Sequence, residues 1–310
     1  MNTARLIHTA QALVDDVIDV PSLPRRGQNT VAAGRVRQAG GAVTVLLAAA
    51  RSGAVCVHAG SVGLGSNGDL IRDVLAGDGI AVSSPVVEQV DSGVCLVFVE
   101  PTAERTFITV QGAERRITTA SLATSRPAPG DYVAVSGYTL QGPSADPLMA
   151  WLSSLPAGVV VVLDPGAAFA DLDKTVKKQM LNMTTMWTSN AEEALALTGD
   201  PDMTTAAPKV LAMLPAGAIA VVRDGEAGCT VATTDDTTVV PGFPQIPVDT
   251  NGAGDTHTGV LLAELLLGST PVTAARRANV AGALKVTRRG VDKTPTRTEI
   301  DAFLAQLHNQ

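Results

Sequence analysis

The stretch VDTNGAGDTHTGVLLAELLLG, residues 248–268, places two carboxylates, Asp249 and Asp255, around a Gly-Ala-Gly turn. From Thr256 onward its apolar residues recur at helical spacing, so we expect a helix over residues 253–267. The first amides of a helix have no partner within it and carry partial positive charge, and small residues let an anion approach them closely. The stretch therefore predicts an anion-binding turn with a carboxylate beside it.

A simpler interpretation is that Asp255 only caps the helix while the glycines make a tight turn. That interpretation does not explain two carboxylates six residues apart around Gly-Ala-Gly. Phosphoryl transfer needs this combination, because amide donors must hold the migrating charge while a base orients the attacking hydroxyl and accepts its proton. The pattern therefore favours phosphoryl transfer over a simple cap.

Outside this stretch, short β-branched runs alternate with Ala- and Leu-rich runs of helical length. GVVVVLD (158–164) and AIAVVRD (218–224) are apolar almost throughout, as expected of parallel strands covered on both faces. We expect a three-layer α/β fold with a central, mostly parallel sheet. The expected strands are 5–10, 54–59, 94–99, 105–110, 131–136, 158–163, 184–188, 218–222 and 229–233. The expected helices are 41–52, 67–77, 145–154, 171–181, 190–198, 204–213, 253–267, 271–288 and 297–307.

Residues 14–37 and 91–112 interrupt this alternation, because each holds strand-like runs with no helix between them. We expect them to form a small β lid over the site, within a single domain that spans residues 1–310.

Composition excludes several classes of function. The net charge is −7 with no extended basic run, so a nucleic-acid partner is not expected. The three cysteines form no C-x-x-C pair, which argues against a disulfide framework or a structural zinc site. No apolar leader and no run of 18 apolar residues occur, so we expect no signal peptide, no membrane partner and a cytoplasmic location.

A second glycine pattern, GLGSNG, places Gly63, Gly65 and Gly68 as G-x-G-x-x-G between an apolar strand and a helix. Such a turn can bind the pyrophosphate of a dinucleotide, so an NAD-dependent oxidoreductase is one alternative. The fingerprint alone is weak, and it leaves residues 248–260 unexplained.

Several segments together resemble one family. DTNGAGDTHTG (249–259) resembles the second signature, D-T-x-G-A-G-D-x-F-x-x-G, of the ribokinase-like (PfkB) carbohydrate kinases, with His257 where that family usually has Phe. QAGGAVTVLLAAARSG (38–53) looks like the first signature, and residues 60–80, which include GLGSNG, resemble a G-x-V-G-x-D-x-x-G stretch. The resemblance spans nearly the whole chain and implies a ribokinase-like three-layer fold with a β lid.

The resemblance also implies roles for individual residues. Asp255 would be the general base that activates the acceptor hydroxyl, and Gly252, Ala253 and Gly254 would supply amides to the transferring phosphoryl group. ATP and Mg²⁺ would be the cofactors. The residues implied near them are Asn190, Glu193, Arg223, Gly225, Gly228 and Asn279.

Each of these cofactor residues also has a simpler interpretation. Asn190 and Glu193 fit a helix cap with its capping-box partner, and both roles can hold together. Arg223 would contact phosphate or face solvent. A lone helical asparagine such as Asn279 would lie near the adenine or have a structural role.

Many relatives bind a monovalent cation beside the anion hole, so we also expect K⁺. Asp249 would supply its carboxylate, unless this side chain only braces the turn. The remaining oxygen ligands implied by the resemblance are the backbone oxygens of Asn251, Arg288 and Gly290 and the hydroxyl of Thr294.

The acceptor side departs from the family pattern. The resemblance implies that Asp15 binds paired hydroxyls and that Gly40, Gly41 and Thr44 line the acceptor; the alternative for Asp15 is an exposed strand-end pair with Asp16. Arg105, in the lid, would close over the acceptor or bind a phosphate that the acceptor carries. Leu13, Thr44 and Gly65 stand where ribokinases have other residues, so the acceptor is not identified.

We therefore expect an ATP-dependent kinase that phosphorylates a hydroxyl of a sugar or nucleoside. The alternatives are an NAD-dependent oxidoreductase built on Gly63–Gly68 and a non-catalytic relative that binds a sugar. Pairing of two lids would give a homodimer.

Overall fold

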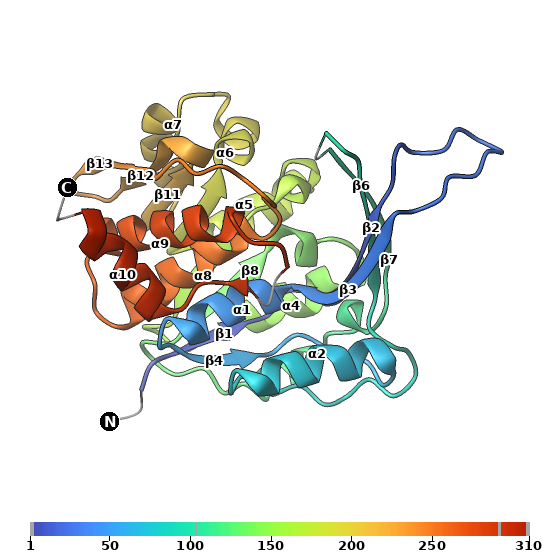
Figure 1. Ribbon diagram of the computed structural model, residues 1–310. Helices are drawn as coiled ribbons and strands as arrows, with labels where there is room; N and C mark the ends of the chain where they lie inside the picture. Colours follow the sequence, from blue (N-terminus) through green and yellow to red (C-terminus); the bar gives the residue numbers. More distant parts are fainter. Residues whose placement is uncertain (1–2, 103, 291–292, 308–310) are drawn as a thin grey trace.

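A nine-stranded sheet forms the centre of the molecule (Figure 1). The computed structural model describes residues 3–102, 104–290 and 293–307. The strand order is β13-β12-β11-β10-β9-β8-β1-β4-β5. Each neighbouring pair from β11 to β5 is parallel, whereas β12 is antiparallel to both of its neighbours, β11 and β13. Its strands are β1 (Arg5–His8), β4 (Val55–His58), β5 (Ala81–Val82), β8 (Tyr132–Ser136), β9 (Val160–Asp164), β10 (Met186–Asn190), β11 (Ile219–Arg223), β12 (Gly228–Ala232) and β13 (Thr237–Pro241).

Helices cover both faces of this sheet. Successive residues of a strand point to opposite faces, so apolar residues on both faces must be buried under helices. Leu6 of β1 belongs to one buried cluster and its neighbour Ile7 to the other. The cluster around Leu6 is completed by α1 (Ala42–Arg51), α2 (Ser66–Gly77), α8 (Ala253–Leu266), α9 (Pro271–Val286) and α10 (Arg297–Leu307). The cluster around Ile7 is completed by α3 (Thr119–Ala123), α4 (Ala145–Leu152), α5 (Lys174–Met183), α6 (Ala191–Thr198) and α7 (Met203–Leu211). The predicted three-layer α/β fold is confirmed.

A second, smaller sheet stands beside the first (Figure 1). We call it the small sheet; its order is β3-β2-β6-β7. It consists of β2 (Ala12–Asp19), β3 (Gly34–Gly41), β6 (Val94–Val99) and β7 (Arg105–Val110). The two regions singled out in the sequence, 14–37 and 91–112, supply most of these strands, and the loop between β2 and β3 projects away from the body of the molecule (Figure 1).

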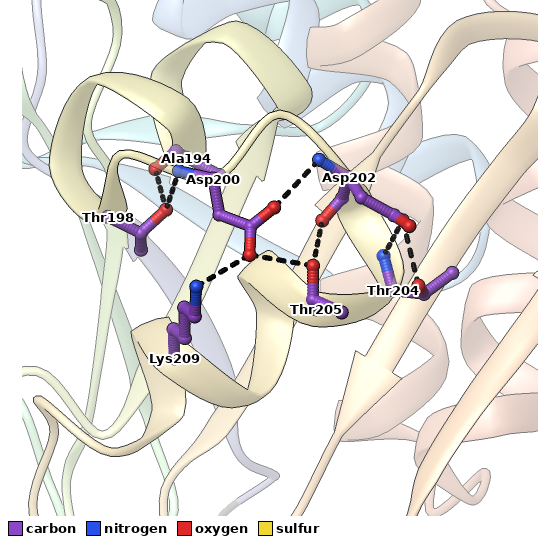
Figure 2. A network of polar contacts seen from close by, with 7 residues as sticks. All are labelled: Ala194, Thr198, Asp200, Asp202, Thr204, Thr205 and Lys209. Atoms are coloured by element: carbon purple, nitrogen blue, oxygen red, sulfur yellow. Dashed lines mark hydrogen bonds and ion pairs between the residues drawn. The ribbon is translucent and has the colours of Figure 1, made fainter.

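A polar network fixes the turn between α6 and α7 (Figure 2). Asp200 accepts hydrogen bonds of 2.7 Å from Lys209 Nζ and from the Thr205 hydroxyl, and the bond with Lys209 is the largest cause that lowers the pKa of Asp200 to about 2. Asp202 caps α7 by accepting from the amide of Thr204 at 2.8 Å. The network stays ionised at ordinary pH and holds α6, whose N-terminus faces the candidate site.

The chain reverses its direction of winding between β1 and β8, because β4 and β5 follow on one side of β1 and β8 to β13 on the other. Ligands of such sheets bind at the carboxyl ends of the strands near this point. Asp164, Asn190 and Arg223 end β9, β10 and β11 there. Among the described residues, no helix combines the length and the apolar character needed to cross a membrane.

Candidate active site

The N-terminus of α8 carries the Gly-Ala-Gly turn. Gly252 precedes the helix in the left-handed conformation (φ 72°), which a glycine adopts without strain, and no side chain caps the helix. The first helical hydrogen bond runs from the amide of Thr256 to the carbonyl of Gly252 at 2.8 Å. The amide of Ala253 donates instead to the carbonyl of Thr250 at 3.3 Å, so it is partly engaged within the turn. An uncapped helix start of this kind favours an anion.

Close packing brings the turn against α1. A Cβ built on Gly252 would lie 3.1 Å from Cγ2 of Thr44 and 3.8 Å from Cε of Lys285. A Cβ on Gly259, about two turns further along α8, would collide with the backbone carbonyl of Val45. Only glycines at these positions let α8 lie this close to α1, and Thr44 is thereby placed next to the turn.

Arg223 is the central cation of the site. Its Nη1 donates to the hydroxyls of Thr258 at 2.6 Å and Thr188 at 3.0 Å, and its Nη2 lies 3.7 Å from Oδ2 of Asp164. The side chain of Asp164 keeps 28% of its surface exposed, against 12% for Arg223. Burial raises the pKa of Asp164, and Arg223 opposes that rise. Arg223 therefore joins β9, β10, β11 and α8 around one positive charge.

The side chain of Asp255, in the first turn of α8, has no hydrogen bond or ion pair with any residue that the structure describes. Burial is the largest cause that raises the pKa of Asp255 to about 7; Asp164 and Asp15 raise it further, whereas Arg223 and Lys285 lower it. A carboxylate with a pKa near neutrality is well suited to general base catalysis.

Asn190 and Glu193 form a capping box at the start of α6. The side chain of Asn190 accepts from the amide of Glu193 at 2.8 Å, and Glu193 Oε2 accepts from the amide of Asn190 at 2.9 Å. Burial, followed by the negative charge of Asp164, raises the pKa of Glu193 to about 7. Both residues line a pocket of about 240 Å³ between the loop after β9 and α6. The simpler, capping interpretation is thus observed. Glu193 is at the same time close enough to the carboxylates of Asp164 and Asp255 for their charges to raise its pKa.

The loop after β11 holds the two predicted glycines. Gly225 has φ 51° and Gly228 has φ 103°, and a Cβ on Gly228 would collide with the carbonyl of Val240. The amide of Asp224 donates to the carbonyl of Gly228 at 2.8 Å. Arg223, just before this loop, points to the site rather than to solvent, so its phosphate-facing interpretation is the one that the geometry supports.

Asn279 is buried on α9 and fully engaged within the protein. Its Nδ2 donates to the carbonyls of Val240 at 3.0 Å and Pro241 at 3.1 Å, so its Oδ1 accepts from Nε2 of His257 at 3.1 Å. Burial lowers the pKa of His257 to about 3, which keeps the ring neutral. The predicted contact of Asn279 with adenine is not supported, because both amide donors are used to join α9 to β13.

Asp15 lies on β2, in the small sheet, and points toward the site. Burial raises the pKa of Asp15 to about 6. A Cβ on Gly40 would collide with the carboxylate of Asp15. Gly41 takes φ 62° where β3 passes into α1. Asp16, the next residue, faces the other side of the sheet and is paired with Arg35. The small sheet therefore brings the carboxylate of Asp15 close enough to Asp255 to raise the pKa of Asp255.

Arg105 joins the small sheet to the segment that leads into the Gly-Ala-Gly turn. Its Nη2 donates to Oδ1 of Asp249 at 2.6 Å and its Nη1 to the hydroxyl of Thr250 at 2.9 Å. Oδ1 of Asp249 also accepts from the amide of Asn251 at 2.9 Å. The predicted cation ligand Asp249 thus braces the turn, which was the alternative interpretation, and Arg105 is bound to it rather than pointing to an acceptor.

The GLGSNG turn is closed to a dinucleotide. The amides of Asn67 and Gly68, which would have to hold a pyrophosphate, donate to the carboxylate of Asp91 at 3.0 and 2.8 Å. The carboxylate of Asp91 also lies where a Cβ of Gly65 would stand. The alternative of an NAD-dependent oxidoreductase built on Gly63–Gly68 is therefore wrong, because an internal anion fills the place of the cofactor.

Replacing Asp91 with Ala should lower the free energy of unfolding by about 1–2 kcal/mol, since the first amides of α2 lose their acceptor. Urea denaturation measures this loss. NAD should bind neither form in a calorimetric titration; binding to the variant would mean that Asp91 alone blocks a dinucleotide site.

Three residues of the site were not predicted from the sequence. Asp164 ends an apolar strand, a position that itself signals a site in parallel sheets. Thr188 and Lys285 give no comparable signal, because a hydroxyl at a strand end and a lysine in a helix are common surface features.

Comparison with known proteins agrees with this geometry. A family model described as pfkB family carbohydrate kinase matches residues 8–298. The Escherichia coli (strain K12) protein named Uncharacterized sugar kinase YegV is 31% identical over 296 residues, 93% of this chain and 90% of that protein. The Bacillus subtilis (strain 168) ribokinase is 26% identical over 298 residues, 94% of this chain and 96% of its own.

Among solved structures, Arabidopsis thaliana ribokinase complexed with ribose and ATP has a TM-score of 0.81 at 22% identity, covering 98% of this chain and 99% of that one. At this identity the likeness concerns the fold alone. The sequence relationship extends over nearly the whole chain, and so the chain belongs to the pfkB family of carbohydrate kinases.

Proposed function

We propose that the protein transfers the γ-phosphoryl group of ATP to a hydroxyl of a sugar or nucleoside, with Asp255 as the general base. The observation that carries this proposal is the pairing of an uncapped helix start with a carboxylate whose pKa is raised, mainly by burial, to about 7. The two sheets would act as one kinase domain, with the small sheet as its lid.

The roles of the protein groups follow from their positions. Asp255 would accept the proton of the attacking hydroxyl, and the first amides of α8 would hold the charge of the migrating phosphoryl group. Arg223, beside Gly254 and Asp164, would contact the phosphates on the nucleotide side. Asp15 would bind acceptor hydroxyls from the small sheet, and closure of that sheet would exclude water.

Mg²⁺ fits the carboxylates on the nucleotide side. Asp164 and Glu193 offer the oxygen ligands that Mg²⁺ prefers, and the ion usually keeps several waters while it binds phosphates. No group of three or more His, Cys, Asp or Glu is arranged to hold a metal directly among the described residues, which agrees with an ion held largely by water and nucleotide. When bound, Mg²⁺ would neutralise charge on the ATP phosphates.

A screen of ADP release over sugars, sugar phosphates and nucleosides tests the proposal. A kinase should release ADP in proportion to one of these acceptors. If an acceptor instead raises the melting temperature while no phosphate is transferred, the non-catalytic, sugar-binding alternative replaces the proposal.

Replacing Asp15 with Asn should raise the KM of the acceptor about 10- to 100-fold, because charge-assisted hydrogen bonds to hydroxyls contribute about 1.5–3 kcal/mol each. The dissociation constant of ATP should not change, since Asp15 lies on the small sheet. Initial rates at varied acceptor and a separate ATP titration measure both quantities.

Asp16→Asn is the matched control for this change. It alters the neighbouring carboxylate, whose partner is Arg35 on the other side of the small sheet. Asp16→Asn should leave the KM of the acceptor unchanged. Equal effects of the two variants would show that Asp15 acts through the stability of β2 and not through the acceptor.

We also propose that two small sheets pair in a homodimer. Val36, Phe107 and Ile108 of this sheet are each more than half exposed, at 56%, 56% and 53%. Sedimentation should show a dimer for the wild type and a monomer for Phe107→Asp.

A further inference from the structure

Three of the five oxygens expected to hold a K⁺ ion already accept hydrogen bonds from cationic side chains. Asp249 accepts from Arg105 at 2.6 Å, and the hydroxyl of Thr294 accepts from Nη1 of Arg51 at 2.9 Å. The third contact concerns a backbone oxygen of the same set: the carbonyl of Arg288 accepts from Nζ of Lys285 at 3.2 Å. This set does not fit a bare K⁺ ion, because a second cation would enter among groups that already carry positive charge.

Lys285 is the unusual member of this group. It lies in the last turn of α9 and is fully buried, with 0% exposure. A buried ammonium is costly unless it is hydrogen-bonded and its charge is compensated. The carbonyl of Arg288 accepts one of its hydrogen bonds, and the C-terminal end of α9 supplies negative partial charge. The carbon next to the ammonium, Cε, lies 3.8 Å from a Cβ built on Gly252, within contact distance of the anion-binding turn.

The turn and α9 are also joined through the backbone. The amides of Val248 and Asp249 both donate to the carbonyl of Val286, at 2.7 and 3.0 Å. The segment that leads into Gly-Ala-Gly therefore rests directly on the residue after Lys285. A change in the charge beneath the turn would therefore alter the position of the amides proposed to hold the phosphoryl group.

We propose that the ammonium of Lys285 takes the place of the monovalent cation beneath the anion-binding turn, so that phosphoryl transfer by this protein does not require K⁺. Lys285 is a positioning residue: it acts through the turn. The proposal rests on the proposed kinase function.

An ammonium can fill this role for simple reasons. It carries the same single charge as K⁺ and donates a hydrogen bond to the carbonyl of Arg288, one of the oxygens that would otherwise coordinate the ion. Because it is covalently attached, its occupancy does not depend on the salt concentration. Its charge is also felt at the base: burial raises the pKa of Asp255, and Lys285 is one of the cations that lower it.

Salt substitution in the wild type is the first test. ADP release should show the same kcat and KM in KCl, NaCl and choline chloride at equal ionic strength, and the melting temperature should be the same in KCl and NaCl. Saturable activation by K⁺, or stabilisation by K⁺ over Na⁺, would overturn the proposal.

Two variants provide the second test. Lys285→Met keeps the volume without the charge and should lose activity on the order of 10²-fold in every salt. Lys285→Ala opens space next to the carbonyl of Arg288 and beneath Gly252, so its activity should fall similarly in NaCl and return at least in part with KCl, NH₄Cl or methylammonium chloride. Its melting temperature should rise in KCl relative to NaCl. A merely structural lysine would not be replaced by added cations.

Lys178→Ala is the control, because Lys178 is an exposed residue of α5. It should behave as the wild type in each salt. Full activity of Lys285→Met, or a loss in Lys285→Ala that no cation restores, would contradict the proposal; if either variant does not fold, the wild-type salts decide. If no acceptor is phosphorylated in any salt, the kinase function fails, while the melting temperatures of the wild type in K⁺ and Na⁺ still decide the question of the cation.

Discussion

Replacing Asp255 with Asn should lower kcat by about 10²–10⁴-fold, the range attributed to a general base. Asn keeps the size of Asp and does not accept the proton of an attacking hydroxyl. The dissociation constant of ATP should stay close to that of the wild type, because the amides of the turn are unchanged. Rapid-quench or coupled ADP assays measure kcat, and a fluorescent nucleotide competition measures ATP binding.

The dependence on pH should change in the same variant. Burial raises the pKa of Asp255 to about 7, and a base works only in its deprotonated form. The wild-type kcat should therefore rise with pH through about 7 and then level off. The residual rate of Asp255→Asn should lack this rise.

Stability separates loss of the base from loss of the fold. Between the ordinary pKa of an aspartate and about 7, the folded protein binds more protons at Asp255 than the unfolded chain, so this residue costs stability as the pH rises through that window. Asp255→Asn should therefore melt at a higher temperature than the wild type at pH 8.

Asp235→Asn, in the exposed turn between β12 and β13, should change neither kcat nor melting temperature. Full turnover of Asp255→Asn would remove the base from the proposed mechanism.

The sequence predicted the central sheet because its strands are apolar on both faces and are separated by helical runs. It did not predict β5, β13 or α3, which have two, five and five residues. β5 is too short to show a period, and β13 (TTVVP) and α3 (TASLA) lack the apolar run that marks β9 and β11, two strands of the same length. α3 does carry a local signal, since Thr118 and Ser121 form a capping box.

The predicted turn depends on contiguous residues, and for this reason it was visible in the sequence. The contacts that define the rest of the site join residues far apart in the chain. Arg105 and Asp249 are 144 positions apart, and Arg223 and Thr188 are 35 positions apart. No local pattern encodes such a pair, so the ion pair beneath the turn became apparent only in the folded structure.

Local patterns can also mislead. GLGSNG satisfies every local requirement of a dinucleotide turn, and its helix start is real. What excludes the cofactor is Asp91, which arrives from another segment and accepts from the amides of Asn67 and Gly68. Whether a helix start can bind a ligand depends on its tertiary neighbours, and this distinguishes α2 from the uncapped α8.

The second large effect is expected at Arg223. Replacing Arg223 with Met should lower kcat by about 10²–10³-fold, because the only cation that joins β11 to Asp164 and Thr258 among the described residues is lost and the phosphates lose a charged donor. The pH profile should change as well. After burial and Asp164, which raise the pKa of Asp255, Arg223 is the largest influence that lowers it. The rise of kcat should therefore move to higher pH in Arg223→Met.

Asp164→Asn is the matched variant, for which the pH at which kcat rises should shift in the opposite direction. Its carboxylate raises the pKa of Asp255 after burial does, so its removal should move the rise of kcat to lower pH. A pH profile of both variants, at saturating ATP and acceptor, measures the two shifts. Shifts in the same direction, or none, would mean that Arg223 and Asp164 do not set the charge of Asp255; opposite shifts would tie the base to the ion pair at the ends of β9 and β11.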